Sequence, residues 1–207
     1  MSEKRELSGA EQKRLERFES IAQEMDARGY TRHDLTINIK KANWFAVFLI
    51  IPLFIVGYGL FYLVNRSFGF GRFNILLFFA GYLVLVVLHE LIHGLTWSIF
   101  TPRNFKDIEF GIMRPSMNPY CTCLAPLRKT PYIIGTAMPL VLLGILPMIV
   151  GIAIGNAVVL FWGIVMTDGA AGDIMIMGRL LGYKSSAGEI AYMDHPTEAG
   201  GVVFERI

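Results

Sequence analysis

Two histidines and a glutamate stand together in an otherwise apolar stretch, LVVLHELIHGLTWSIF, at positions 85–100. His89, Glu90 and His93 form the pattern H-E-x-x-H. Residues four apart share a helix face, so His89 and His93 can bind one metal ion. Glu90 lies about 100° round from His89, where it can take a proton from water without being a ligand. The pattern predicts a catalytic zinc (Zn²⁺) site with Glu90 as the base.

The same three residues could instead be ordinary polar residues of a helix bundle, because H-E-x-x-H also occurs by chance in unrelated helices. Their surroundings favour the metal site. Ionisable side chains deep in a membrane helix are costly and usually functional. A stretch this apolar therefore makes His89, Glu90 and His93 hard to explain as filler.

The composition indicates a membrane protein with a polar N-terminal segment. Of 207 residues, 54% are hydrophobic and only 17% are charged, whereas soluble domains carry about a quarter charged residues. Positions 1–43 hold nine Lys/Arg and eight Asp/Glu, so much of the remaining chain is almost uncharged. The net charge of +2 gives no case for nucleic-acid binding. An apolar core is missing from the first 30 residues, so we expect no signal peptide there.

The predicted fold class is all-α: four transmembrane helices with a small cytoplasmic cap of one amphipathic helix and short β-strands. Each apolar segment provides the roughly 20 residues that a crossing needs. The predicted spans are Asn43–Asn65, Asn74–Phe100, about 132–154 and about 156–181.

Basic residues set the expected topology. Lys40 and Lys41 precede the first span, and five Lys/Arg lie in the 101–131 connection, whereas the 154–157 turn has none. The positive-inside rule therefore places both termini and the 101–131 connection in the cytoplasm. We expect a multi-pass protein of the bacterial inner membrane.

A third metal ligand has to come from another span at matching depth. Asp168 and Asp173, in the predicted fourth span, are the candidates. At 1.5 Å per residue, Asp173 lies about 13 Å from the cytoplasmic edge and Asp168 about 21 Å, against about 10–17 Å for the histidines. Small residues before Asp173 would allow close helix approach. Depth favours Asp173, with Asp168 open as ligand or as partner of a ligating histidine.

The polar regions predict the cap. Residues 1–34 should form an amphipathic helix and linker, with a capping box at Ser8 and Glu11, and residues 35–207 the four-span domain. In DLTINIKK apolar and polar residues alternate, which predicts a half-buried strand. Residues 105–125 are predicted to form a hairpin with which this strand could pair. Cys121 and Cys123 are expected to be reduced thiols, and His33 and His195 solvated or capping residues. No chemical role for Asp194 follows from the sequence.

Five separated blocks resemble the zincin peptidase family of small bacterial membrane proteins, a domain-of-unknown-function group. They are HELIHG, YCTCLAPL, AMPLVLLGILPMIVG, AAGDIMIM and YMDHPTEAGGVVF, within residues 35–204. The resemblance implies a zinc-dependent peptidase in which Asp173, the acid of the Gly-Asp pair, is the third ligand. The layout is also distantly similar to the site-2 proteases. Those carry Asn-Pro before an Asp-Gly pair; this chain has Asp168-Gly169 without it, which keeps Asp168 open.

We therefore expect a zinc peptidase that cuts peptide bonds within or near the cytoplasmic half of the bilayer. His89, His93 and Asp173 would hold the ion. The expected partners are a membrane-protein or peptide substrate and the lipid bilayer, with the oligomeric state open. The alternatives are a metal-binding scaffold or sensor without proteolysis, and a metal-ion carrier that uses intramembrane ligands.

Overall fold

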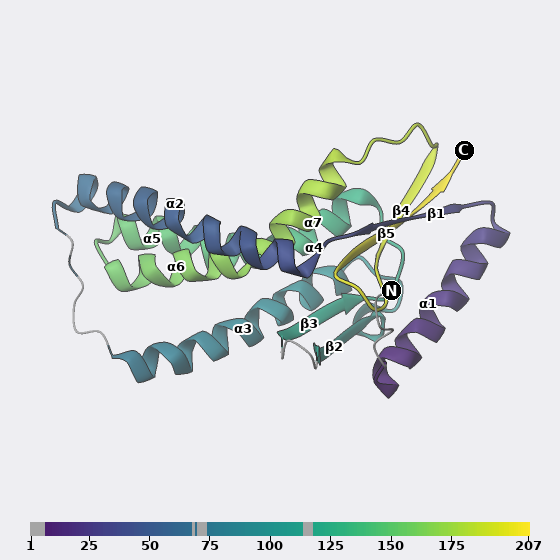
Figure 1. The fold of residues 1–207 in the computed structure, drawn as a ribbon, viewed down its shortest axis with the longest axis horizontal. Helices are drawn as coiled ribbons and strands as arrows, with labels where there is room; N and C mark the ends of the chain where they lie inside the picture. The colour runs from purple at the N-terminus through teal and green to yellow at the C-terminus, as the bar shows by residue number, and fades with distance from the viewer. Residues whose placement is uncertain (1–6, 68, 70–73, 114–117) are drawn as a thin grey trace.

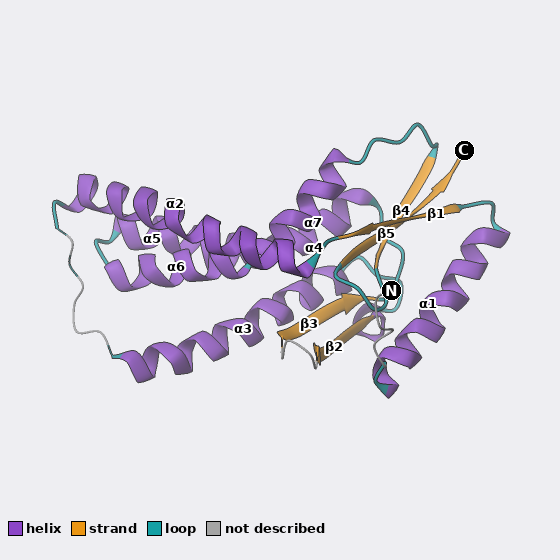
Figure 2. Ribbon diagram, viewed as in Figure 1, coloured by secondary structure: helices purple, strands orange, loops and turns teal. Residues whose placement is uncertain are grey.

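The computed structural model describes residues 7–67, 69, 74–113 and 118–207, and it is mostly helical (Figure 1; Figure 2). A helical bundle occupies one end, and two small β-sheets and helix α1 occupy the other. The turn of the predicted hairpin and most of the 66–73 loop lie outside the described residues. The helices are α1 (Gly9–Ala27), α2 (Ile39–Asn65), α3 (Ile75–Ser98), α4 (Lys129–Pro139), α5 (Leu146–Ala153), α6 (Ala157–Gly169) and α7 (Ala171–Gly182).

Three helical stretches in the described part of the chain are long and apolar enough to span a membrane. They are α2, α3 and the continuous stretch from Lys129 to Ala153. Asparagine caps begin two of them: the side chain of Asn38 accepts from the Lys41 N–H, and that of Asn74 from the first amides of α3. Such caps satisfy backbone donors that have no partner inside the helix.

The third and fourth predicted spans are not continuous α-helices. A π-helical segment, Leu140–Ile145, follows Pro139 and separates α4 from α5. Pro147, in the first turn of α5, lacks an N–H donor, and its ring crowds the carbonyl of Leu143 within this segment, which accounts for the change of pitch there. The fourth stretch bends by 52° between α6 and α7, and only the two helices together are long enough to span a membrane.

The strands form two antiparallel sheets. In one, the order is β1 (Thr31–Thr36), β5 (Gly200–Arg206), β4 (Glu189–Asp194); in the other, β2 (Ile108–Met113) pairs with β3 (Asn118–Cys123). The expected pairing of the 35–40 strand with the hairpin is wrong. Residues from Ile39 on belong to α2, and Thr31 of β1 pairs with Glu205 instead. The C-terminal strand β5, and not the hairpin, is the pairing partner of β1.

Helix α1 has the predicted capping box, because the Ser8 side chain accepts from the Glu11 N–H and the Glu11 side chain returns to the Ser8 backbone. Its buried Phe18 packs with Met193, Val202 and Phe204 of the C-terminal sheet. The apolar stripe of α1 therefore stabilises the protein's own fold.

The β2–β3 ribbon packs directly on the last turns of α3. Gly94 makes this approach possible: a Cβ at that position would lie 2.4 Å from the ring of Phe110 and 3.0 Å from Ile108. A second core joins α3 to α4 and the C-terminal sheet through Trp97, Tyr132 and Tyr192. Both contacts concentrate the packing of α3 at its Ser98 end, next to the histidines.

Candidate metal centre

His89, His93 and Asp173 meet between α3 and the first turn of α7. Nε2 of His89 lies 3.0 Å from Oδ2 of Asp173 and 3.2 Å from Nε2 of His93. Nε2 of His93 lies 3.5 Å from the other carboxylate oxygen of Asp173. Both histidines are more than 90% buried. Three possible ligand atoms from two helices thus converge on one point, and the group could hold a metal ion.

The spacing and chemistry of these atoms fit zinc. Ligand atoms held about 2.0–2.1 Å from a tetrahedral ion lie about 3.3 Å from one another. The two histidine nitrogens lie 3.2 Å apart, and each lies 3.0 or 3.5 Å from one of the two Asp173 oxygens, distances close to that value. Two imidazoles and one carboxylate also make a zinc donor set that leaves a fourth position open. The residues present therefore fit a catalytic type of zinc site.

Helix α4 orients the ring of His93. Nδ1 of His93 lies 2.8 Å from the backbone carbonyl of Gly135, which can only accept a hydrogen bond. Nδ1 therefore carries the proton, and Nε2 faces the site with its lone pair. On the other side, Trp97 stacks on the His93 ring at 5.1 Å between centroids. The ring has one orientation that satisfies both contacts.

The bend at Ala170 separates the two candidate aspartates. Asp168 belongs to the end of α6, whereas Asp173 lies in the first turn of α7, a position where the helix dipole favours a carboxylate. Asp168 is outside the His–His–Asp group, and its buried Oδ1 has no hydrogen-bond partner among the described residues. The depth comparison of the two aspartates assumed one straight helix, whereas the chain bends by 52° between them and Asp173 lies against α3.

Glu90 lines two cavities. The bundle-side cavity, about 210 Å³, is bounded by Tyr82 and Val86 of α3 and by Met166 and Gly169 of α6. The sheet-side cavity, also about 210 Å³, extends from the same carboxyl group to Arg14 of α1. His89 faces the first cavity, and His93 and Asp173 face the second. The glutamate is thus accessible from both directions.

A model of the family described as "Putative zincin peptidase" matches residues 82–187. The chain belongs to this family. The matched region, just over half of the chain, contains His89, Glu90, His93 and Asp173, whereas α1, β1, α2, β4 and β5 lie outside it. No curated protein and no solved structure matches the chain. Membership in the zincin peptidase family supports a metallopeptidase in general terms.

Within the zincin region, one edge of β3 faces the metal centre. The Leu124 N–H donates to the Asp107 carbonyl on the β2 side, and backbone N–H groups alternate between the two edges of a strand. The N–H groups of Cys121 and Cys123 therefore point away from β2. The backbone of Cys121 lies close to the Glu90 carboxylate. Both cysteines are free, and burial raises the pKa of each thiol. Both thiols are therefore un-ionised at neutral pH.

Sequence reasoning missed Asp194, at the end of β4, which lines the sheet-side cavity together with Glu90 and His93. One of its oxygens accepts from the Cys123 N–H at 2.6 Å, and the other accepts from the Tyr132 hydroxyl. Burial raises the pKa of Asp194 to about 6. The only hint in the sequence was that Asp194 lies in a block that resembles the family. Its hydrogen-bond partners, Cys123 and Tyr132, are 71 and 62 residues away in the chain.

The remaining predicted polar residues lie away from the ligand group. Nδ1 of His195 accepts from the backbone N–H groups of Thr197 and Glu198, as expected for a capping residue. His33 is exposed on β1. Arg14 of α1 is buried at the far end of the sheet-side cavity, where it donates to the Pro196 carbonyl and pairs with Glu109.

Proposed function

We propose that the protein is a zinc-dependent, membrane-embedded peptidase that hydrolyses peptide bonds within or near the cytoplasmic half of the bilayer. One observation carries the proposal: the ligand atoms of His89, His93 and Asp173 lie within 4.8 Å of one another, beside a glutamate that faces two cavities. Membership in the zincin family supports the same chemistry.

His89 and His93 would hold zinc through Nε2, and Asp173 through a carboxylate oxygen. When bound, zinc supplies Lewis acidity toward a carbonyl and toward water. Glu90 adjoins His89 in the sequence and borders the space beside the ligands, so it accepts the proton of the attacking water and returns it to the leaving amine. Gly135 keeps the Nδ1 proton of His93 in place, which leaves Nε2 free for the metal.

The two cavities supply a path for the substrate. An extended chain along the edge of β3 that faces the metal centre would gain backbone hydrogen bonds as an added strand. Pro119, at the start of this edge, borders both cavities. The chain would then pass Glu90 between the bundle-side and sheet-side cavities. This arrangement would present an unwound segment, because a helical substrate conceals its scissile amides.

Our proposal for location is the bacterial inner membrane, with both termini and the two sheets on the cytoplasmic side. The membrane-length helices and the distribution of Lys and Arg around them support it. In this orientation the sheet-side cavity would admit water from the cytoplasm.

The decisive experiment uses the zinc-loaded full chain in lipid nanodiscs, with a reporter peptide anchored to the bilayer by a transmembrane helix. Glu90→Gln should lower the cleavage rate at least 100-fold, the lower range for general-base catalysis, and leave the zinc content unchanged. Asp34→Asn, on the exposed strand β1, is the control and should cleave as the wild type does.

Three results would count against parts of this proposal. Wild-type protein that holds one zinc without cleaving any anchored reporter would favour the scaffold or sensor. Zinc transport into sealed vesicles without cleavage would favour the carrier. Cleavage that survives Glu90→Gln would remove Glu90 from the reaction.

A further inference from the structure

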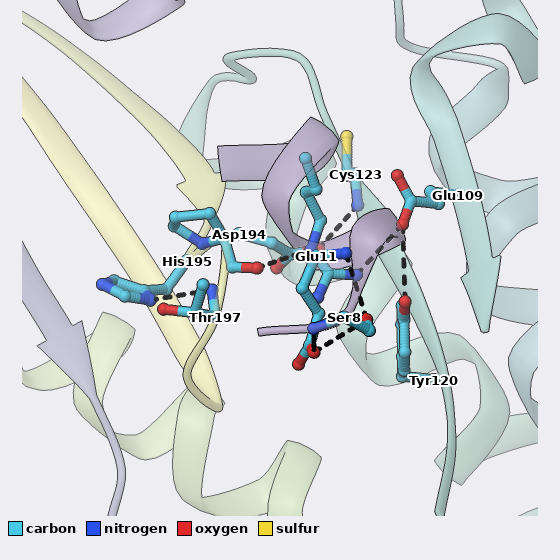
Figure 3. Close-up of polar contacts among 10 residues, drawn as sticks. Ser8, Glu11, Glu109, Tyr120, Cys123, Asp194, His195 and Thr197 are labelled. Carbon is cyan, nitrogen blue, oxygen red and sulfur yellow. Dashed lines mark hydrogen bonds and ion pairs between the residues drawn. The ribbon is translucent and has the colours of Figure 1, made fainter. Parts of the chain in front are cut away.

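Asp194 joins three parts of the protein that are distant in sequence. It stands at the end of β4, outside the region matched by the family model. Its carboxylate accepts from the backbone of β3 at Cys123 and from the hydroxyl of Tyr132 on α4 (Figure 3 shows the contact with Cys123). Both oxygens are therefore occupied, and the side chain is not in the His–His–Asp group. A carboxylate in this state holds its neighbours in place.

The first neighbour is the edge of β3 that faces Glu90. The backbone N–H groups of Cys121 and Cys123 point to the same edge of the strand, with about 7 Å between them. The Cys121 backbone contacts Glu90, and the Cys123 N–H contacts Asp194. Asp194 thus anchors β3 at Cys123, two residues along the strand from Cys121, which lies beside Glu90. Its removal would leave a buried N–H without an acceptor and free the strand to shift relative to Glu90.

The second neighbour is Tyr132, in the first turn of α4, the helix whose Gly135 carbonyl holds His93. The Tyr132 ring lies against Trp97, at 5.8 Å between centroids, and Trp97 lies against His93. Nε1 of Trp97 donates to the Tyr132 carbonyl at 3.2 Å. Three residues later, Gly135 accepts from His93. A displaced Tyr132 would therefore alter both contacts that orient the His93 ring.

We infer that Asp194 is a positioning residue of the metal centre, which fixes the edge of β3 against Glu90 and, through Tyr132, the orientation of His93. This inference rests on the proposed function for its effect on the reaction. It also assigns a role to the C-terminal sheet: β4 ends inside the site and supplies the carboxylate.

The test compares Asp194→Ala with Asp194→Asn in the full chain in nanodiscs. Asparagine can still accept from the Cys123 N–H with its oxygen and donate to the Tyr132 hydroxyl with its nitrogen. We expect alanine to lower kcat about 10–100-fold and to raise KM, the range known for residues that orient metal ligands. Asparagine should restore both values to within threefold of wild type.

A readout independent of catalysis is the visible spectrum of the protein loaded with Co²⁺ in place of zinc. Asp194→Ala should change the absorption bands, because His93 is reoriented, and Asp194→Asn should restore them. The matched control is Glu189→Ala. Glu189 lies at the opposite end of β4 and also accepts from a tyrosine, Tyr30, so its loss affects the same sheet without touching the site.

Each outcome bears on the inference. An unchanged Co²⁺ spectrum in Asp194→Ala overturns it, as does a loss of activity no greater than that of Glu189→Ala at equal thermal stability. Loss of bound metal from both Asp194 variants would make Asp194 a ligand and also overturn it. If the spectrum changes as expected but wild type cleaves nothing, the inference stands and the proposed peptidase function fails.

Discussion

The carbonyl oxygen of Gly135 lies 2.8 Å from Nδ1 of His93, at a position where no larger residue fits. A Cβ at position 135 would lie 2.0 Å from Nε1 of Trp97, the ring that stacks on His93 from the other side. The absence of a side chain at position 135 thus allows α4 and α3 to approach closely enough for the backbone to hold the imidazole.

Gly135→Ala should therefore weaken metal binding. Trp97 would have to move, which disturbs the ring of His93, and contacts of this kind are worth about 10–100-fold in metal affinity. Competition with a zinc chelator measures the change. Gly178→Ala is the control, because a Cβ there meets nothing within 4 Å. Equal affinities for the two variants would show that the Gly135 contact does not orient His93.

The two aspartates should differ in their effect on the metal. Asp173 lies 3.0 Å from His89, so Asp173→Ala should lower the zinc content of purified protein at least tenfold, because two histidines seldom suffice. Asp168→Ala should retain the ion, since Asp168 lies outside the His–His–Asp group. Metal analysis by mass spectrometry measures both. Full zinc in Asp173→Ala, or its loss in Asp168→Ala, would reverse the assignment.

A bulky side chain at Gly169 should block the bundle-side cavity. A Cβ at this position meets no neighbour within 4 Å, so Gly169→Trp can fill the cavity without a clash at its base. We predict at least tenfold slower cleavage of a bilayer-anchored reporter, with the zinc content unchanged. Gly59→Trp, in a similarly open position on α2, should cleave at the wild-type rate. Equal rates for both variants would exclude entry through this cavity.

The buried carboxyl of Asp194 should make stability depend on pH. Burial raises its pKa to about 6, above the value of about 3.9 in an unfolded chain. The folded protein then binds more protons between these values, so stability falls as the pH rises from about 4 to 6. The charges of His93 and Asp173 lie nearby and act in opposite directions.

Denaturation midpoints of metal-free protein across this range test the effect. Asp194→Asn cannot ionise, so it should gain stability relative to wild type as the pH rises from 4 to 7. A constant difference between the two proteins would show that Asp194 does not titrate in this range.

The sequence was most informative where the pattern was local. The spacing of four residues predicted that His89 and His93 share a helix face. The expected depth in the membrane favoured Asp173 over Asp168 as the third ligand. Both arguments depend only on helix geometry, and the structure brings these three side chains together. The capping box at Ser8 followed from the same kind of short-range rule and is present.

Long-range features were not predictable from one sequence. The bend at Ala170 has no proline to mark it, so α6 and α7 read as one helix. The pairing of β1 with β5 joins residues 174 positions apart. The alternation of polar and apolar residues in either strand does not indicate which strand it pairs with. Asp194 illustrates the same limit: its importance lies in contacts with β3 and α4, which only the folded chain brings together.

The central position of β5 in the three-stranded sheet has a consequence for the order of assembly. Strand β1 is translated early but gains its pairing partner only when residues 200–206 emerge, after all the membrane-length helices. The sheet therefore cannot form while the bundle is being synthesised. Because β4 holds Asp194 in this sheet, the metal centre should mature as a late event. Ribosome-bound chains arrested before position 200 should then lack the mature site.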